Sequence, residues 1–221
     1  MYFCKTFFRP IILFDAMSKT KGILYAAVSS STFGLAPFFS IMLLTTGFSS
    51  FEVLSYRWGV ASATLILFGL ISGCSFRLNK KDFGTVFLLS LFRAATSLSL
   101  VIAYQNIASG VASIIHFMYP LAVALAMMLF FHEKKSLWTI TAILASIAGA
   151  VFLSSGDISH SGGNTTVGII AACISVFSYG GYIIGVRKSR AVQINSTVLT
   201  CYVMGIGALL FIICGSFTSG I

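Results

Sequence analysis

Charged residues are scarce in this sequence. Asp, Glu, Lys and Arg together make up 9% of its 221 residues, whereas 57% are hydrophobic and the mean hydropathy is +0.99. Soluble domains typically carry about 25% charged residues. The composition therefore excludes a water-soluble globular protein and predicts a chain whose main solvent is a lipid bilayer.

Acidic residues are especially few, and none lies deep inside an apolar run. They fall at the edges of such runs or between them: Asp15, Glu52, Asp82, Glu133 and Asp157. A membrane-embedded enzyme would need paired carboxylates, a nucleophile with a base, or metal ligands facing one cavity. Because none of these patterns occurs, we expect no enzymatic activity, no metal and no cofactor.

Ligand spacings are also missing among the cysteines. The five cysteines show no CxxC pattern, and a Cys inside an apolar run behaves as a small hydrophobic residue. We therefore expect neither a metal site nor a disulfide. The net charge of +9 comes from short basic clusters between apolar runs, without interleaved aromatics, so we expect no nucleic-acid partner.

Long apolar runs dominate what is present. Seven of them, bounded by charge, lie near 22–44, 51–73, 83–105, 109–131, 136–154, 166–186 and 197–215. Each is long enough to cross a bilayer as a helix. Lipid offers no partners to a bare backbone and the runs lack the alternation of outer-membrane strands, so only helices can span. The predicted fold is an all-α, polytopic membrane protein.

The positive residues lie on alternate connections. Twelve of the 14 Lys and Arg residues precede the first run or lie in the second, fourth and sixth connections, and the other connections hold none. Positive charge marks the cytoplasmic side of a membrane protein. We therefore expect a cytoplasmic N-terminal segment at 1–21, an external linker at 155–167 and a multi-pass protein of the cell membrane.

An internal repeat is indicated by matches at a single offset of 146 residues. The matched pairs include Ser29 with Ser175, Gly34 with Gly180, Tyr56 with Tyr202 and Gly59 with Gly205. Compositional coincidence is the alternative. Because a five-span unit is odd, its second copy would be inverted, an arrangement that places a solute site between the halves. We predict a first five-helix repeat at 22–154 and the start of a second at 168–221.

The repeat also bears on the ends of the chain. A second copy of equal length would end near residue 300, which is 146 residues beyond residue 154. We therefore expect the chain to be a fragment or a truncated product with seven of ten helices. Met17, which opens the lead-in MSKTKG, is an alternative start.

Arg93 lies midway along the run 83–105, where a charge costs at least about 2.5 kcal/mol on insertion scales. Steps of three and four residues place Ser97 and Tyr104 on the same helix face, which predicts a polar stripe along a watery cavity. The alternative is a structural Arg bonded to backbone carbonyls. Arg57 lies nearer the external end of its run, so we expect it to reach that interface.

Three further candidates lie close together in the run 109–131: His116, Tyr119 and Pro120. Proline loosens backbone carbonyls, although a lone His is more often structural. Phe33 of the first run and Tyr179 of the sixth complete the predicted solute-binding set. Intramembrane arginines without a buried acid favour a solute that carries a carboxylate or another anionic group.

Residues 118–156 read MYPLAVALAMMLFFHEKKSLWTITAILASIAGAVFLSSG, and the opening at 22–39 reads GILYAAVSSSTFGLAPFF. Both stretches resemble EamA-type transporters of the drug/metabolite transporter superfamily. The residues that carry the resemblance are Pro37, Arg57, Pro120, Glu133 and Gly149, and all of these except Pro120 are assigned structural roles. Three positions depart from the family pattern, because His132 replaces a usual Gly, Ala142 a common mid-span Gly and Ala150 a usual Val.

The resemblance implies ten spans in two inverted halves around a central cavity. It implies secondary transport of a small organic solute, such as a metabolite, an amino acid or a drug-like compound, usually across the bacterial inner membrane. The expected partners are then the lipid bilayer and that solute, and a homo-oligomer stays open. The alternative is an inactive remnant or a non-transporting membrane partner protein.

Overall fold

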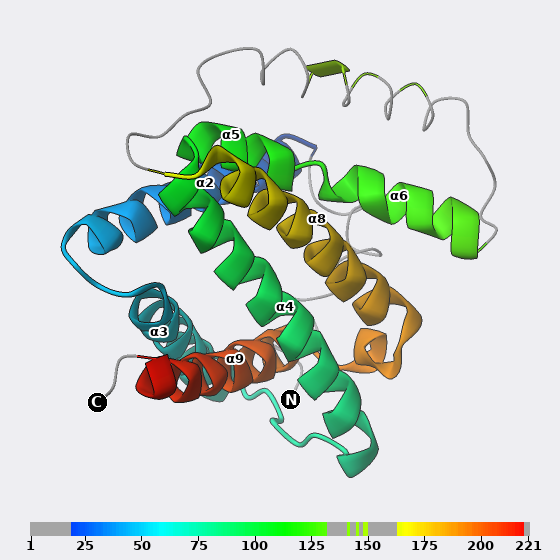
Figure 1. Ribbon diagram of the computed structural model, residues 1–221. Coiled ribbons are helices and arrows are strands. Elements are labelled where there is room, and N and C mark those ends of the chain that lie inside the picture. Colours follow the sequence, from blue (N-terminus) through cyan, green and yellow to red (C-terminus); the bar gives the residue numbers. More distant parts are fainter. Residues whose placement is uncertain (1–18, 132–140, 142–144, 146–147, 150–162, 219–221) are drawn as a thin grey trace. The chain divides into compact units, whose positions relative to one another are not determined.

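The structure, a computed structural model, describes residues 19–131, 141, 145, 148, 149 and 163–218 of the chain (Figure 1). Within this part of the chain every element is a helix. The elements are α2 (Lys19–Thr45), α3 (Ser50–Ile71), α4 (Lys80–Asn106), α5 (Ser109–His116), α6 (Tyr119–Phe130), α8 (Thr165–Lys188), the 3-10 helix η2 (Arg190–Gln193) and α9 (Ser196–Thr218).

Five helical stretches are long and apolar enough to cross a membrane. They are Ser50–Ile71, Asp82–Asn106, Ser109–Phe130, Thr165–Lys188 and Ser196–Phe217. The protein is therefore a helical, multi-pass membrane protein, as its composition predicts. The expected run at 22–44 falls within the helix α2, whereas the run at 136–154 lies almost entirely outside the described residues. The count of seven spans stays a prediction.

Side-chain caps set where two of the spanning helices begin. Ser49 accepts a hydrogen bond from the amide of Glu52, whose carboxylate accepts one from the amide of Ser49 at 2.7 Å, which forms a capping box at the start of α3. The side-chain oxygen of Asn164 accepts hydrogen bonds from the amides of Thr166 and Val167 and so caps the start of α8. Caps of this kind satisfy amides that have no partner within their helix.

The fourth apolar run is not one continuous helix. It divides into α5 and α6 at Phe117 and Met118, and Pro120 lies in the first turn of α6. Proline has no amide hydrogen and cannot bond to the carbonyl four residues earlier, here that of His116. The chain tightens instead, and the amide of Met118 donates to the carbonyl of Ile115 at 3.0 Å.

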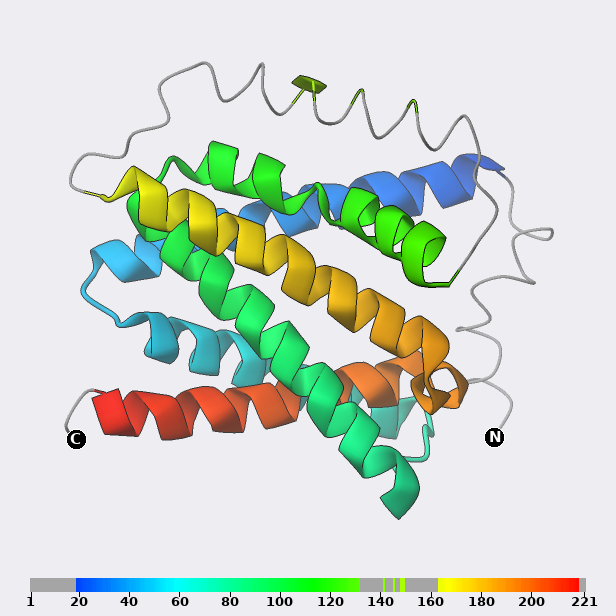
Figure 2. The same ribbon diagram turned by 45° about the vertical axis from the view of Figure 1, so that its right-hand side comes forward.

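The described helices form two compact units, of which the first contains α2, α3 and α9. The last two lie side by side and antiparallel (Figures 1 and 2), since Gly207 meets Trp58 while Gly205 meets Ser62. Ser62 also donates to the carbonyl of Cys201 at 3.2 Å. Glycine lets two backbones approach closely, which is the usual way that helices associate in lipid.

The second unit contains α4, α5, α6 and α8. The most extensive helix–helix interface in this unit is between α4 and α8, which lie side by side in both views (Figures 1 and 2). Gly185, Gly181 and Gly168 of α8 face Leu89, Phe92 and Ile107 of α4, in that order. The order reverses along the two helices, so this pair is antiparallel as well.

The expectation that no cysteine forms a disulfide is wrong at one position. Cys74, which follows α3, is disulfide-bonded, whereas Cys173 and Cys201 are thiols. A disulfide requires two Cα atoms within about 7 Å, and spacing along the sequence does not reveal such proximity.

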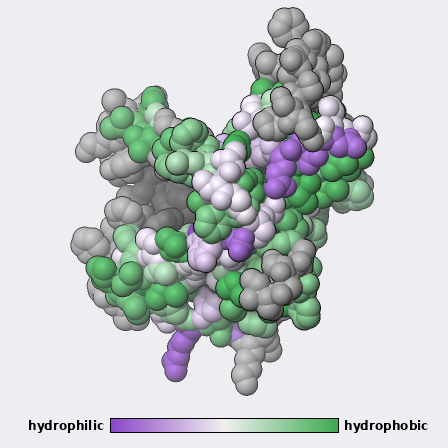
Figure 3. All heavy atoms as spheres, turned by 60° about the vertical axis from the view of Figure 1, so that its left-hand side comes forward, coloured by the Kyte–Doolittle hydropathy of each residue, from purple (hydrophilic) through white to green (hydrophobic). Residues whose placement is uncertain are grey.

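The outer surface of the described residues is largely apolar. Figure 3 shows hydrophobic residues over much of one face, with strongly hydrophilic residues in only a few places. Large apolar side chains are exposed on several helices, including Ile71 at 85% and Phe217 at 86%. Such a surface would drive association in water, and it suits contact with acyl chains.

Gly207 provides a test of the contact between α3 and α9. A Cβ added there would overlap the ring of Trp58, whereas one added at Gly84 would meet nothing within 4 Å. We expect Gly207→Ala to lower stability by about 1–3 kcal/mol, the usual cost of overpacking. Thermal unfolding of the full chain in detergent measures this cost, with Gly84→Ala as the matched control. Equal midpoints for the two variants would contradict the close contact.

Candidate functional site

A cluster of one arginine, one histidine and three tyrosines lies in the second unit. Its members come from four helices: Arg93 from α4, His116 from α5, Tyr119 from α6, and Tyr179 and Tyr182 from α8. All of these except Tyr182 belong to the predicted solute-binding set. The fold thus brings together side chains from distant parts of the chain.

Arg93 is the charged member of this cluster. It is the middle residue of α4, about 20 Å from either end of the helix. Its guanidinium carbon lies 4.9 Å from the centroid of the Tyr179 ring and 6.0 Å from that of Tyr182. Contacts of this kind stabilise a cation by about 0.5–2 kcal/mol, which offsets part of the cost of placing Arg93 deep in the membrane.

His116 is almost completely buried, with 3% of its surface exposed. Its Nδ1 lies 3.0 Å from the hydroxyl oxygen of Ser175, and that hydroxyl donates to the carbonyl of Ala172 at 2.6 Å. A serine hydroxyl has a single hydrogen to donate, so Nδ1 of His116 is the donor in its bond to Ser175. In the neutral ring Nε2 is then the acceptor.

The aromatic rings contact one another. Tyr119 and Tyr179 meet edge to face with their centroids 4.5 Å apart, and the His116 ring lies 5.7 Å from Tyr119 and 5.4 Å from Tyr179. Edge-to-face pairs contribute about 0.5–1.5 kcal/mol beyond the area they bury. The break between α5 and α6 lies directly between His116 and Tyr119, so it sets how these two rings face Tyr179.

The other predicted solute-binding residues belong to α4, α6 and α2. Tyr104 is buried farther along α4, with its hydroxyl 3.4 Å from that of Ser113. Ser97 is half-buried on the same helix, and Pro120 is exposed at the start of α6. Phe33 belongs to α2, in the first unit.

The residues with predicted structural roles also differ in their surroundings. Arg57 donates to the hydroxyl of Ser40 at 2.6 Å, which joins α3 to α2. Pro37 lies within α2, and Gly149 is exposed with open space where a Cβ would stand. Glu133 lies outside the described residues.

Sequence reasoning did not place Tyr182 and Ser175 among the candidates. With Tyr179 they lie at intervals of four and three residues, which is one face of a helix. The spacing 175, 179, 182 is thus the signal that identifies them. Among the described residues there is no group of three or more His, Cys, Asp or Glu that could hold a metal ion.

The fold and the cluster define a class of protein: a helical, multi-pass membrane protein with a cationic, aromatic cluster at mid-depth. Residues 20–155 match the EamA-like transporter family, and the chain belongs to that family. Proteins of this family are transporters rather than enzymes. No curated protein and no solved structure matches the chain.

A double-mutant cycle tests the bond between His116 and Ser175. Ser175→Ala removes the acceptor of a buried donor, which costs about 1–3 kcal/mol. In the His116→Phe background the same change should cost less, with a coupling of about 0.6–2 kcal/mol. Thermal unfolding of the four proteins in detergent gives both values. Additive effects would contradict the hydrogen bond.

Proposed function

We propose that the chain transports a small organic solute across the membrane as a secondary transporter of the drug/metabolite type. Its membership of the EamA-like family supports transport. The single observation that carries the site is Arg93 at mid-helix against the rings of Tyr179 and Tyr182. A charge at that depth is usually retained for function.

The chemistry of the cluster favours a solute with a carboxylate or another anionic group. A guanidinium can stack on an aromatic ring and still donate hydrogen bonds from its planar edge. Carboxylates bind that edge in a bidentate manner. The cluster combines one cation with aromatic rings. The rings of Tyr119 and Tyr179 would contact the apolar part of the solute.

The solute site is proposed to lie between two inverted repeats, at 22–154 and 168–221. In a repeat with an offset of 146 residues, α3 corresponds to α9. These helices run antiparallel, and the contacts Ser62 to Gly205 and Trp58 to Gly207 bracket Val60 and Ile206, which are 146 residues apart. Equivalent positions thus meet where the helices cross, as two inverted copies require about a shared axis.

Uptake into vesicles tests transport and the role of Arg93 together. Proteoliposomes with the full chain should accumulate at least one of a panel of radiolabelled carboxylate solutes above protein-free vesicles. Arg93→Ala should lower that uptake at least about tenfold, the usual effect of losing a charged hydrogen bond to a ligand. Arg93→Lys should retain part of it, because the charge remains while the fork is lost.

The matched control is Arg77→Ala, which removes an exposed arginine of the loop after α3 and should leave uptake unchanged. Tyr179→Phe, which keeps the ring, should also transport. Uptake by Arg93→Ala equal to that of the original chain would rule out the anionic solute. No uptake of any solute by any variant would instead favour the non-transporting partner.

The direction of the chain in the membrane has its own test. Seven spans and a cytoplasmic N-terminus place residue 221 on the external side. An alkaline phosphatase fused after Ile221 should then be active and a green fluorescent protein dark, because each folds on one side only. The opposite pair of results would contradict the count of seven spans.

A further inference from the structure

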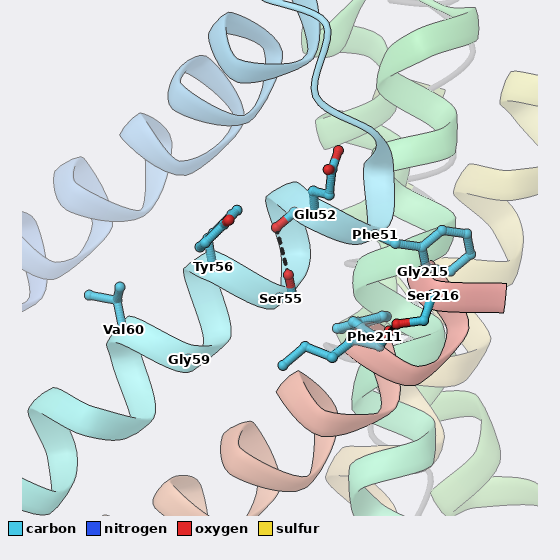
Figure 4. Close-up of a pocket in the computed structure, with 10 residues that line it drawn as sticks. Phe51, Glu52, Ser55, Tyr56, Gly59, Val60, Phe211, Gly215 and Ser216 are labelled. Atoms are coloured by element: carbon cyan, nitrogen blue, oxygen red, sulfur yellow. Dashed lines mark hydrogen bonds between the residues drawn. The ribbon is translucent and has the colours of Figure 1, made fainter. Parts of the chain in front are cut away.

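A groove of about 510 Å³ lies between α3 and α9 in the first unit (Figure 4). This volume lies within the range of ligand sites, which is roughly 300–1,000 Å³. Gly59 forms part of its floor, and a Cβ added at that glycine would meet nothing within 4 Å. The groove is thus open over a span of α3 where a side chain would fill it.

Apart from the hydroxyl of Tyr56, the polar side chains of the groove gather at one end. Glu52 and Ser55 belong to the first two turns of α3, and Ser216 to the last turn of α9. Gly59, Val60 and Ile212 continue the lining with apolar surface, of which Val60 is 66% exposed. From Glu52 to Val60 the groove extends about 12 Å along the helix, which is most of one roughly 15 Å leaflet of hydrocarbon.

The polar end offers hydrogen-bond acceptors. The Ser55 hydroxyl donates to the carbonyl of Glu52 at 2.9 Å, and the Ser216 hydroxyl donates to that of Ile212 at 2.9 Å. Each serine has then used its one hydrogen and presents an oxygen to a ligand. The Glu52 carboxylate accepts from the amide of Ser49, and a carboxylate has about four such positions.

This pattern selects the charge of the occupant. The lining contains one carboxylate and no Lys or Arg, so its charge favours a cationic group at the polar end. An ammonium group has three donors and no acceptor, which suits an end that offers hydroxyl and carboxylate oxygens. An amphipathic molecule with such a head and an apolar tail fits both ends of the groove.

We propose that this groove binds a phospholipid with a primary ammonium head group. The ammonium lies at the polar end of the groove, near Glu52, and one acyl chain lies over Gly59 and Val60. The head group is then at the side of the membrane where α3 begins, which the distribution of Lys and Arg predicts to be external. The site lies in the first unit, and its occupancy does not depend on Arg93 or on transport.

Native mass spectrometry of the full chain tests this site. The chain is released from detergent after incubation with equal amounts of phosphatidylethanolamine, phosphatidylcholine and phosphatidylglycerol of identical acyl chains. Phosphatidylethanolamine should be retained about threefold more than the other two, an effect of the size of an exposed ion pair. Phosphatidylcholine is informative because its head is cationic but has no N–H donor.

Two variants test the contact with the lipid head group and the contact with the acyl chain separately. Glu52→Gln keeps the capping box, which accepts Glu or Gln, and should abolish the preference for phosphatidylethanolamine. Asp82→Asn, in the first turn of α4, is the matched control and should keep it. Gly59→Leu should lower retention of all three lipids by filling the groove, whereas Gly84→Leu, at a glycine with equally open space, should not.

Three results would overturn the proposal. Equal retention of the three lipids would show that the groove does not select an ammonium head group. A preference that survives Glu52→Gln would show that the head group binds elsewhere. If Gly59→Leu changed the mass of the oligomer and left lipid retention unchanged, the groove would be a contact between two copies of the chain.

Discussion

Hydrocarbon offers no hydrogen-bond partners, and most features of this structure follow from that constraint. Several hydroxyls within the spans donate to carbonyls of their own helix, as Ser90 does to Val86 and Thr96 to Phe92, both within 2.8 Å. Among the described residues no buried side-chain nitrogen or oxygen lacks a partner. The same constraint explains the surroundings of Arg93, which contacts the ring of Tyr179, and of His116, which bonds to the hydroxyl of Ser175.

The constraint also changes how the helices associate. Burial of apolar surface gives little driving force in lipid, so close packing must supply it. Both antiparallel pairs meet through glycines of the later helix: Gly205 and Gly207 of α9, and Gly181 and Gly185 of α8. Each glycine receives a large side chain or a hydroxyl from the earlier helix. The contact continues to the ends of these helices, where a Cβ added at Gly215 would lie 3.3 Å from the Cβ of Phe51.

Sequence reasoning predicted the helices well and the contacts between them poorly. The apolar runs give the ends of α3, α8 and α9 to within two or three residues, because span length and flanking charge are local properties of the chain. The break before Pro120 was not predicted, although one residue explains it. The bond between Arg57 and Ser40 and the contact of Arg93 with Tyr182 depend on the packing of separate helices, which no local pattern encodes. The disulfide at Cys74 likewise depends on proximity in space.

The candidate site joins the matched family region to a helix beyond it. Arg93, His116 and Tyr119 lie within residues 20–155, whereas Ser175, Tyr179 and Tyr182 belong to α8. At the offset of 146 residues, Ser175 and Tyr179 correspond to Ser29 and Phe33 of α2. The serine is kept in both proposed copies, but the phenolic hydroxyl is present only in α8. The proposed halves, although related, therefore differ at the ring that Arg93 contacts.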